Sequence, residues 1–405
     1  MVKILHLQYG TTAASPANRL HRAFVENGLS SQILSLYADN IQSSDIHILD
    51  KKSILKSKVN NFIESHLVKG KVRELGKFSY PVLGSNISSH NQVQEADVIY
   101  VHWVLNGFLS IKNLEQLAVL GKPLIFVMHD MWTITGGCHH SFDCTKYQDH
   151  CQNCQFFNGN RIRDVSYKGF KKKQKFFNRF ENLYFVSPSA WLYKCAQKSA
   201  LTRNKPIFHI GNTLNVNLFK PIDKKVAKQI LNVDVDKKII AFGAMAIDSP
   251  YKGWAYLKNS LDVLFNSGYI NFIILIFGSG TNPEIADAIP YETKFIGFVD
   301  NEYATSVIYN AADVFVTPSL ADNLPYTILE SLSCGTPVVA FDVGGIPELI
   351  NHKSNGYLAK YKDANDLASG IEYCINEKVI GYRLKEFDHN SIIEKHLNLI
   401  NRVTT

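Results

Sequence analysis

Residues 317–339 read TPSLADNLPYTILESLSCGTPVV, and this stretch decides the fold. It places two carboxylates, Asp322 and Glu330, eight residues apart in a passage with the pattern strand, loop, helix, glycine, strand. The apolar run 314–316 is typical of a buried parallel strand, and we expect a short helix over 326–334. Backbone amides at the start of such a helix point at an anion beyond the strand end. The spacing therefore suggests a diphosphate site, with an ordinary strand-helix-strand unit as the alternative.

Length and composition favour a globular protein of two domains. The chain has 405 residues, more than a single hydrophobic core usually supports, and is 46% hydrophobic and 20% charged. Apolar strands and amphipathic helices alternate along the whole length, which predicts an α/β architecture with doubly wound parallel sheets. The polar stretch 211–221 ends in a proline, and we expect it to connect the two domains.

Charge and hydropathy narrow the class of partner. The formal net charge of +7 favours anionic partners, but no RNP, zinc-finger or basic-zipper pattern supports nucleic acid. The N-terminus reads as a strand that runs into a turn at Gly10, too short and too polar for a secretory signal. No window holds 18 continuous apolar residues, so no membrane span is predicted. We therefore expect a cytoplasmic protein that does not bind nucleic acid.

The sequence around the opening stretch resembles the GT-B glycosyltransferases of family 4. In that family an acid, seven residues and a Glu precede a Cys-Gly-Thr-Pro-Val run, as Asp322 and Glu330 do in this chain. The likeness continues through YNAAD at 309–313, DVGGIPEL at 342–349 and NGYL at 355–358. A Cys-rich segment further upstream looks similar to those of the capsule, exopolysaccharide and O-antigen biosynthesis branch.

This resemblance implies the GT-B fold, in which two Rossmann-like, doubly wound parallel-sheet domains face each other across a cleft. We expect an acceptor-binding domain over residues 1–210, with a Cys-rich insertion at 136–155. A nucleotide-sugar donor domain is expected over 211–385. Residues 386–405 are expected to form a helix that crosses back to the N-terminal domain.

The resemblance also implies an activity. Members of the family are retaining glycosyltransferases that move a sugar from a nucleotide diphosphate sugar to an acceptor. For this chain we expect the acceptor to be a lipid-linked glycan in surface polysaccharide synthesis. GT-B enzymes of this kind need no catalytic metal, so we expect no cofactor for catalysis. The family has no agreed protein nucleophile, and we assign none. A GT-B nucleotide-sugar epimerase and a non-enzymatic, zinc-organised binding module are the alternative functions.

Four residues are expected to act in catalysis: His129, Lys252, Asp322 and Glu330. Lys252 matches the family's Lys-Gly position, where the ammonium meets the diphosphate. Glu330 matches the carboxylate that accepts hydrogen bonds from the ribose hydroxyls. Asp322 stands where the family most often has a Glu that reaches toward the donor sugar. His129 follows a predicted strand, and in the family a His at this place contacts the donor sugar or supports the developing charge.

Further residues are expected to bind the donor through backbone amides or glycine turns: Gly10, Gly278, Gly280, Asn323, Leu324 and Tyr326. The family usually has an Arg after the glycine that ends the first strand of the second domain, but this chain has Ala244. That departure leaves Lys252 with more of the positive charge opposite the diphosphate. The Gly-Gly pair common in the first glycine loop of the group is also absent after Gly10.

Four cysteines, Cys138, Cys144, Cys151 and Cys154, lie within 17 residues. The Cys-x-x-Cys spacing of Cys151 and Cys154 suits half of a tetrahedral zinc site, but the five residues between Cys138 and Cys144 are a poor partner spacing. A structural zinc held by all four is one interpretation. Two disulfides or free thiols are the others.

Two lysine-rich segments raise the question of membrane contact. Residues 168–180 combine lysines with four phenylalanines, which is typical of a helix lying on anionic lipid at the inner face of a membrane. The alternative is a domain helix that buries its phenylalanines and exposes its lysines. Residues 51–77 raise the same two alternatives.

Overall fold

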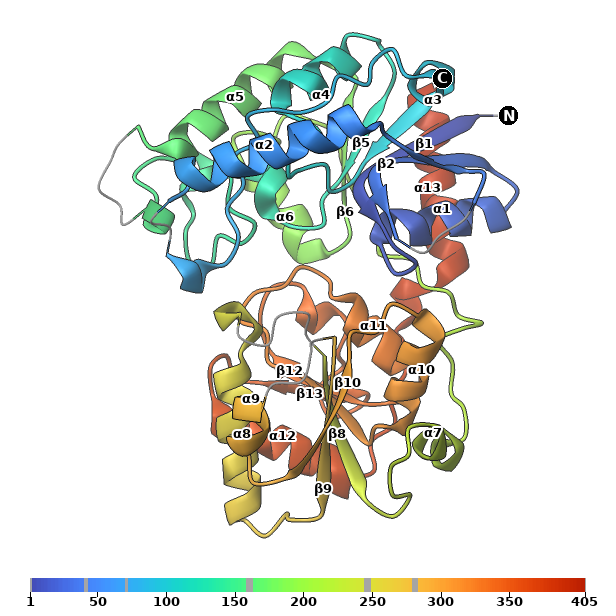
Figure 1. Ribbon diagram of the computed structural model, residues 1–405, viewed down its shortest axis with the longest axis vertical. Coiled ribbons are helices and arrows are strands. Elements are labelled where there is room, and N and C mark those ends of the chain that lie inside the picture. Colours follow the sequence, from blue (N-terminus) through green and yellow to red (C-terminus); the bar gives the residue numbers. More distant parts are fainter. Residues whose placement is uncertain are drawn as a thin grey trace. The chain divides into compact units, whose positions relative to one another are not determined.

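The computed structural model describes residues 2–39, 43–69, 72–157, 163–243, 249–278 and 283–404. It divides into two compact units (Figure 1). The N-terminal unit comprises Met1–Thr213 together with Asn390–Thr405, and the C-terminal unit comprises Leu214–His389. Each unit is built on one parallel sheet with helices on both faces, which confirms the GT-B fold class.

The N-terminal unit contains a seven-stranded parallel sheet of order β3-β2-β1-β4-β5-β6-β7. Its strands are β1 (Lys3–Thr11), β2 (Ser30–Ala38), β3 (Ile46–Ile48), β4 (Val98–Val101), β5 (Leu124–Val127), β6 (Leu183–Ser187) and β7 (Ile207–His209). Its helices are α1 (Pro16–Glu26), α2 (Lys51–Leu67), α3 (Asn91–Glu95), α4 (Ile111–Ala118), α5 (Val165–Arg179), α6 (Ala190–Lys198) and α13 (His389–Thr404), with short 3-10 turns η1 (Arg73–Leu75), η2 (Met131–Ile134), η3 (Lys146–Gln148) and η4 (Gln155–Phe157).

Alternate residues of the N-terminal strands supply two hydrophobic cores, one on each face of the sheet. Leu5 and Leu7 of β1 pack with residues of α4, α5 and α6, whereas Ile4 packs on the other face with α1 and α13. Both faces are covered, so the strands read as continuous apolar runs in the sequence. The terminal helix α13 contributes Ile392 and Ile400 to the second core, and the Tyr100 hydroxyl lies 3.2 Å from Nδ1 of His396.

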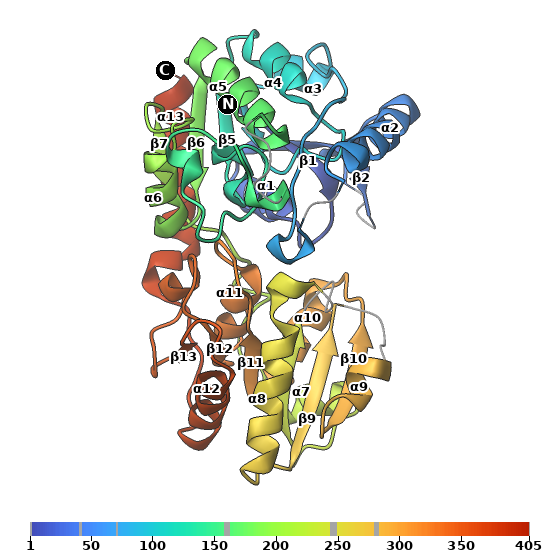
Figure 2. The ribbon, with the colours of Figure 1, turned by 90° about the vertical axis from the view of Figure 1, so that its left-hand side faces the viewer.

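The C-terminal unit contains a six-stranded parallel sheet of order β10-β9-β8-β11-β12-β13. Figure 2 labels β13, β12 and β11 toward one edge of this sheet and β9 and β10 toward the other. Its strands are β8 (Lys238–Gly243), β9 (Phe272–Phe277), β10 (Glu292–Gly297), β11 (Val314–Thr317), β12 (Val338–Phe341) and β13 (Gly356–Ala359). Its helices are α7 (Lys224–Ile230), α8 (Trp254–Asn266), α9 (Pro283–Asp287), α10 (Glu302–Ala311), α11 (Tyr326–Ser333) and α12 (Ala364–Asn376), with 3-10 turns η5 (Pro250–Lys252), η6 (Ile346–Glu348) and η7 (Lys385–Phe387).

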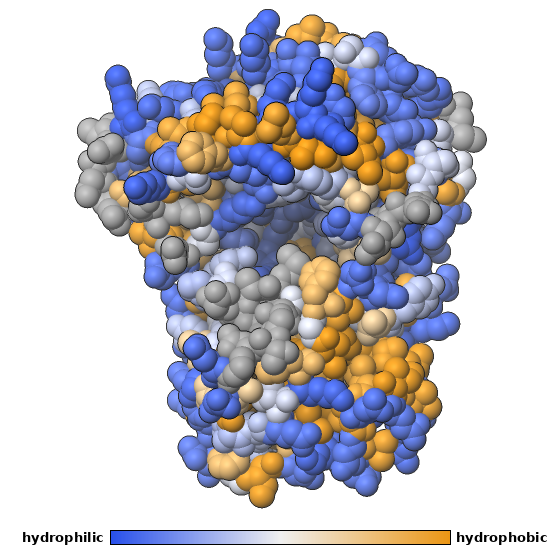
Figure 3. All heavy atoms as spheres, viewed as in Figure 1, coloured by the Kyte–Doolittle hydropathy of each residue, from blue (hydrophilic) through white to orange (hydrophobic). Residues whose placement is uncertain are grey.

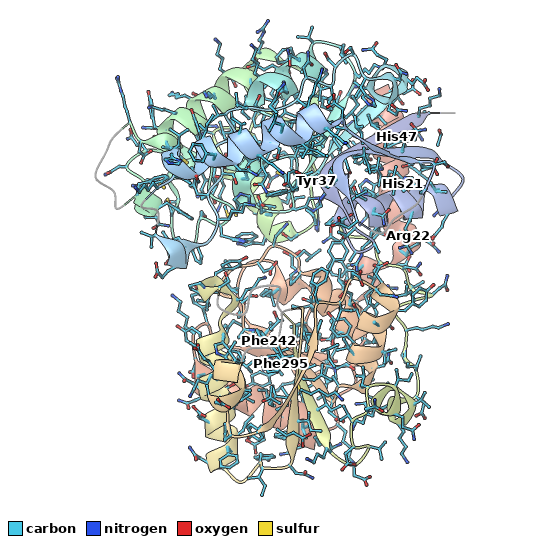
Figure 4. The ribbon with its side chains drawn as sticks, in the orientation of Figure 1. His21, Arg22, Tyr37, His47, Phe242 and Phe295 are labelled. Atoms are coloured by element: carbon cyan, nitrogen blue, oxygen red, sulfur yellow. The ribbon has the colours of Figure 1, made fainter. Side chains whose placement is uncertain are left out.

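Helices cover both faces of the C-terminal sheet as well. Figure 1 shows α8, α9 and α12 on one side and α7, α10 and α11 on the other. Phe242 of β8 is buried in the core beneath α8 and α12, and Phe295 of β10 packs against the same core (Figure 4). Among the helices of the described residues, none combines the length and the hydrophobicity that a membrane span requires.

Candidate functional site

The order of the C-terminal strands singles out one edge of the sheet. Connections run from β8 toward β10 on one side and from β11 toward β13 on the other, so the order reverses between the neighbours β8 and β11. In open α/β sheets, ligands bind at the carboxyl ends of strands at such a switch point. Lys252 follows β8 and Asp322 follows β11, so both lie on loops that leave this switch point.

Lys252 and Asp322 form an ion pair, with 3.3 Å between Nζ and Oδ2. Their side chains are 31% and 20% exposed, so both remain accessible from one side. Burial works to lower the pKa of Lys252, but the facing Asp322 and Tyr251 outweigh burial and raise the pKa above its ordinary value. The ammonium is therefore charged at neutral pH and stands beside a carboxylate at the switch point.

The backbone at position 253 explains why a glycine follows Lys252. It has a left-handed backbone, with φ of 75°, and a Cβ added to it would lie 1.9 Å from the carbonyl oxygen of Pro318. The Leu320 amide also donates to the Tyr251 carbonyl at 2.7 Å. The two loops touch through backbone, and only glycine allows this approach.

The loop after β12 reaches the same place. A Cβ on Gly344 would lie 2.0 Å from the Asp322 carbonyl oxygen, and the Gly345 amide donates to that oxygen at 3.4 Å. The glycine pair of the DVGG run therefore supports the backbone of Asp322. Three loops, from β8, β11 and β12, thus converge on one ion pair.

Glu330 lies on α11 and is only 5% exposed. Tyr309, a fully buried residue of α10, donates its hydroxyl hydrogen bond to Oε2 of Glu330 at 2.9 Å. The Thr336 hydroxyl donates to the Tyr309 carbonyl at 2.7 Å and so fixes the tyrosine from behind. The carboxylate is therefore oriented before any ligand arrives, an arrangement that sequence reasoning missed because Tyr309 lies 21 positions away.

The predicted donor-binding amides of Asn323, Leu324 and Tyr326 lie in the loop before α11 and at its first residue. The residue that precedes the helix is Pro325, which makes no side-chain cap. The Asn323 amide donates to Oδ1 of Asp322 at 2.9 Å, and Leu324 is buried in the core. The loop amide thus orients Asp322, and Tyr326 is the first residue of the helix.

Two predicted glycines follow β9. Gly278 has a left-handed φ of 87°, and its amide donates to the Gly297 carbonyl at 2.8 Å, so it forms the turn that the sequence predicted. Gly280 and Ala244 lie outside the described residues.

In the N-terminal unit, strand order reverses between β1 and β4. The prediction of a turn at Gly10 is wrong, because β1 continues to Thr11 and Gly10 pairs with Tyr37 of β2. The carboxyl ends of these strands instead carry aromatic side chains: the Tyr9 ring contacts those of Tyr37 and Trp103, with centroids 5.4 and 5.6 Å away. Tyr37 is labelled in Figure 4.

His129 ends a chain of three histidines. Its Nε2 lies 3.0 Å from Nδ1 of His102, and Nε2 of His102 lies 2.9 Å from Nδ1 of His6. Burial lowers the pKa of His129 to about 4, against a smaller opposing effect of Asp130, and burial also lowers the pKa of His6 and of His102. His129 is therefore neutral at physiological pH, and its orientation is set by hydrogen bonding to a second imidazole.

The four clustered cysteines lie around one small cavity of about 20 Å³. All four are free thiols, and the Gly136 amide donates to Sγ of Cys151 at 3.2 Å. Burial raises the pKa of Cys151 to about 12 and also raises that of Cys138. Within the part of the chain that the structure describes, no group of three or more Cys, His, Asp or Glu side chains is arranged to hold a metal ion, so the zinc interpretation of Cys138, Cys144, Cys151 and Cys154 gains no support.

The basic aromatic segment 168–180 forms most of α5, and it packs into the domain. Phe170, Phe176 and Phe177 are buried in the core. Lys173 is buried too, donates to the carbonyls of Trp132 and Thr135, and has a pKa that burial lowers to about 7. This favours a domain helix over a lipid-facing one.

Comparison with known proteins finds a family match over the part of the chain that holds these residues. Residues 236–377, which contain Lys252, Asp322 and Glu330, match the family Glycosyl transferases group 1. The C-terminal unit carries a glycosyl transferases group 1 domain. An uncharacterized glycosyltransferase of Haemophilus influenzae is 30% identical over 131 residues, 31% of this chain and 36% of that protein. The chain therefore aligns with little more than a third of that relative.

Longer likenesses extend into the N-terminal unit. The N,N'-diacetylbacillosaminyl-diphospho-undecaprenol alpha-1,3-N-acetylgalactosaminyltransferase of Campylobacter jejuni is 27% identical over 261 residues, 62% of this chain and 67% of that enzyme. The structure of Anabaena Alr3699/HepE in complex with UDP and glucose superposes with a TM-score of 0.62 over 99% of this chain and 100% of that one, at 18% identity. The group 1 domain thus sits in a chain with a two-unit fold of known type.

Proposed function

We propose that the protein is a retaining glycosyltransferase that moves a sugar from a nucleoside diphosphate sugar to a glycan acceptor, lipid-linked, in surface polysaccharide synthesis. The observation that carries the proposal is the Lys252–Asp322 ion pair at the switch point, together with the buried, pre-oriented Glu330 on the helix that follows the Asp322 loop. The Campylobacter relative, named for a diphospho-undecaprenol acceptor, supports the lipid-linked class. The Anabaena structure with UDP supports the nucleotide class.

Each residue has a distinct role in this proposal. As the bond to the leaving diphosphate breaks, negative charge grows on its oxygens, and a positioned cation stabilises it. In this proposal Lys252 supplies that cation in place of a metal ion, and its raised pKa keeps it protonated. Glu330 accepts hydrogen bonds from the ribose hydroxyls. Asp322, released from Lys252 by the diphosphate, accepts bonds from the donor sugar.

The N-terminal unit supplies the remaining groups. In this proposal the neutral His129 supports the donor sugar during transfer. Gly10 and the aromatic rings of Tyr9, Tyr37 and Trp103 lie at the strand ends where an acceptor glycan would stack. The protein would act in the cytoplasm at the inner face of the cell membrane, where a lipid-linked acceptor is anchored.

The test begins with a thermal-shift panel of UDP-, GDP-, ADP- and dTDP-sugars. A ligand at about 100 times its dissociation constant adds about 2.7 kcal/mol to the free energy of unfolding, which a shift in melting temperature reveals. With the stabilising donor, transfer to a polyprenyl-diphosphate glycan should be lost in Lys252→Ala. The matched control is Lys258→Ala, which removes a lysine of α8 paired with Asp262 at 2.8 Å on the surface.

Near-normal transfer by Lys252→Ala would refute the proposal. Conversion of the donor sugar with no acceptor present would instead assign the epimerase function. A donor panel with no stabilisation at all would contradict both.

A further inference from the structure

The helix α2 (Lys51–Leu67) exposes its apolar stripe to solvent, which is the reverse of an ordinary surface helix. Leu55, Val59 and Phe62 recur at intervals of four and three residues, and their side chains are 63%, 44% and 67% exposed. At 100° per residue these positions form one stripe along the helix. A helix on a globular domain normally turns such a stripe toward the core. In α2 the stripe faces solvent.

The opposite side of α2 is polar and buried. The buried residues of the helix are Ser57, Asn60 and Glu64. Each is bonded into the domain: Ser57 donates to the Asn106 carbonyl at 2.6 Å, and Oδ1 of Asn60 accepts from the amides of residues 82 and 83 at 2.9 Å. Oε1 of Glu64 accepts from the Tyr80 amide at 2.8 Å.

These contacts determine how the helix is rotated. Buried polar groups are costly unless they are hydrogen-bonded, and here they are. Rolling α2 over to bury its apolar stripe would break all of these bonds. Gly107 adds a steric constraint, since a Cβ there would lie 2.7 Å from both the Ser57 Cα and the Asn60 Cβ. The exposure of the stripe is thus built into the packing of the domain.

Lysines border the apolar stripe on both sides. Lys51 and Lys58 lie along one border and Lys52 and Lys56 along the other, all exposed. The only acidic residue within α2 is Glu64, which is buried and bonded, while Asp50 before the helix caps the Ser53 amide. Figure 3 shows a band of hydrophobic side chains crossed by projecting hydrophilic ones where Figure 1 places α2. We call this surface the α2 face: Lys51, Lys52, Leu55, Lys56, Lys58, Val59 and Phe62.

We propose that the α2 face docks the protein on an anionic lipid bilayer, with the apolar stripe entering the headgroup region and the lysines contacting lipid phosphates. An exposed apolar stripe flanked by cations is the pattern of helices that lie in a membrane interface. The positive border favours an anionic surface and disfavours a second copy of the same face, which would bring like charges together. The inference deepens the proposed function, whose acceptor is lipid-linked, but lipid binding itself requires neither donor nor acceptor.

The chain offers a matched control for charge. Four exposed lysines of α5, Lys168, Lys171, Lys172 and Lys175, equal in number those of the α2 face, but the phenylalanines beside them are buried. Replacing either set with glutamine changes the net charge of the protein equally. A general attraction of a basic protein to anionic lipid would therefore respond equally to both sets.

The experiment is co-sedimentation of the full chain with phosphatidylcholine vesicles, with and without phosphatidylglycerol. The wild-type protein should bind the vesicles that contain phosphatidylglycerol and release as salt rises. Replacing the four α2 lysines with glutamine should weaken binding by about fivefold per lysine, from about 1 kcal/mol for each basic residue at the surface. The same change in α5 should leave binding within about twofold, since those lysines lack an apolar stripe beside them.

A second pair of variants tests the apolar stripe. Leu55→Ser with Phe62→Ser should weaken vesicle binding by about tenfold or more, because both side chains lose their burial in lipid. The control is Ile270→Ser with Ile380→Ser, whose side chains are 65% and 71% exposed on the C-terminal unit. All four positions are exposed, so circular dichroism should show every variant folded.

Three results would overturn the inference. One is absence of wild-type binding to the anionic vesicles. Another is an equal loss of binding from the α2 and α5 lysine sets. The third is self-association that Leu55→Ser with Phe62→Ser abolishes while vesicle binding stays unchanged, which would make the face an interface between copies. Because no donor or acceptor is present, none of these results bears on the transfer reaction.

Discussion

Glu330 and Tyr309 provide the sharpest test of the donor site. One hydrogen bond joins Glu330, to which we assign ribose binding, to Tyr309, to which we assign only a structural role. Tyr309→Phe removes only the hydroxyl that donates to Oε2 of Glu330 at 2.9 Å. Glu330→Gln keeps the shape of the side chain and removes its charge. The amide oxygen of glutamine can still accept the bond from Tyr309. The two changes therefore separate stability from ligand recognition.

The structure allows the stability effects to be ordered. A hydrogen bond to a charged group contributes about 1.5–3 kcal/mol, and Tyr309→Phe leaves a buried carboxylate oxygen without that partner. For a domain of this size, each kcal/mol lowers the melting temperature by about 2–4 °C. Tyr309→Phe should therefore destabilise the C-terminal unit more than Glu330→Gln does.

Donor affinity should show the opposite order. Glu330→Gln replaces charge-assisted bonds to the ribose with neutral ones, a loss of about 1.5–3 kcal/mol or about ten- to hundredfold in the dissociation constant. Tyr309→Phe keeps the carboxylate and loses only its orientation, so its effect on affinity should be smaller.

The assay pairs urea unfolding with calorimetric titration of the nucleotide, on both single variants and the double variant. The double variant gives the coupling between the two residues for each property. If Glu330→Gln binds nucleotide as tightly as the wild-type protein, the carboxylate serves the fold alone and the assignment to ribose is wrong. If Tyr309→Phe leaves stability unchanged, the hydrogen bond does not contribute as the geometry indicates.

Three further predictions concern backbone, pH and thiols. In urea unfolding, Gly253→Ala should lower the free energy of unfolding more than Gly268→Ala does. Both glycines have a positive φ, but only at Gly253 would a Cβ lie 1.9 Å from a carbonyl oxygen. Equal losses in the two variants would contradict that contact. Burial lowers the pKa of His129 to about 4 and that of His396 to about 3, so the unfolded chain takes up protons at a higher pH than the folded protein does. The free energy of unfolding should therefore fall as pH drops from about 6.5 toward 4, by up to about 1.4 kcal/mol per pH unit for each histidine. A urea midpoint that stays constant over that range would refute this prediction. Burial raises the pKa of Cys151 to about 12, so this thiol should react with Ellman's reagent at pH 8 only after denaturation, when seven thiols are counted; rapid native reaction at Cys151 would show an open cavity.

The local pattern was enough to predict the two parallel sheets and the element order from β11 to β13. Buried parallel strands are continuous apolar runs, and glycines mark the turns between them, so both signals lie within a few residues of each other. The same reasoning placed Asp322 on a loop and Glu330 on a helix after a strand, whereas Lys252 was singled out by the resemblance to family 4. It missed β3 (Ile46–Ile48), which is too short to show a period, and it ended β1 before Gly10, which belongs to the strand.

What the sequence determined by itself was the fold class and the chemical types of residue at the strand ends. Only the tertiary structure decided which of them touch. The Lys252–Asp322 pair joins residues 70 positions apart, and Tyr309 orients Glu330 from another helix. The rotation of α2 and the burial of Lys173 also depend on hydrogen bonds to distant backbone groups. Local propensity sets periods along the chain, but the side of a helix that faces the core depends on partners that the fold brings together.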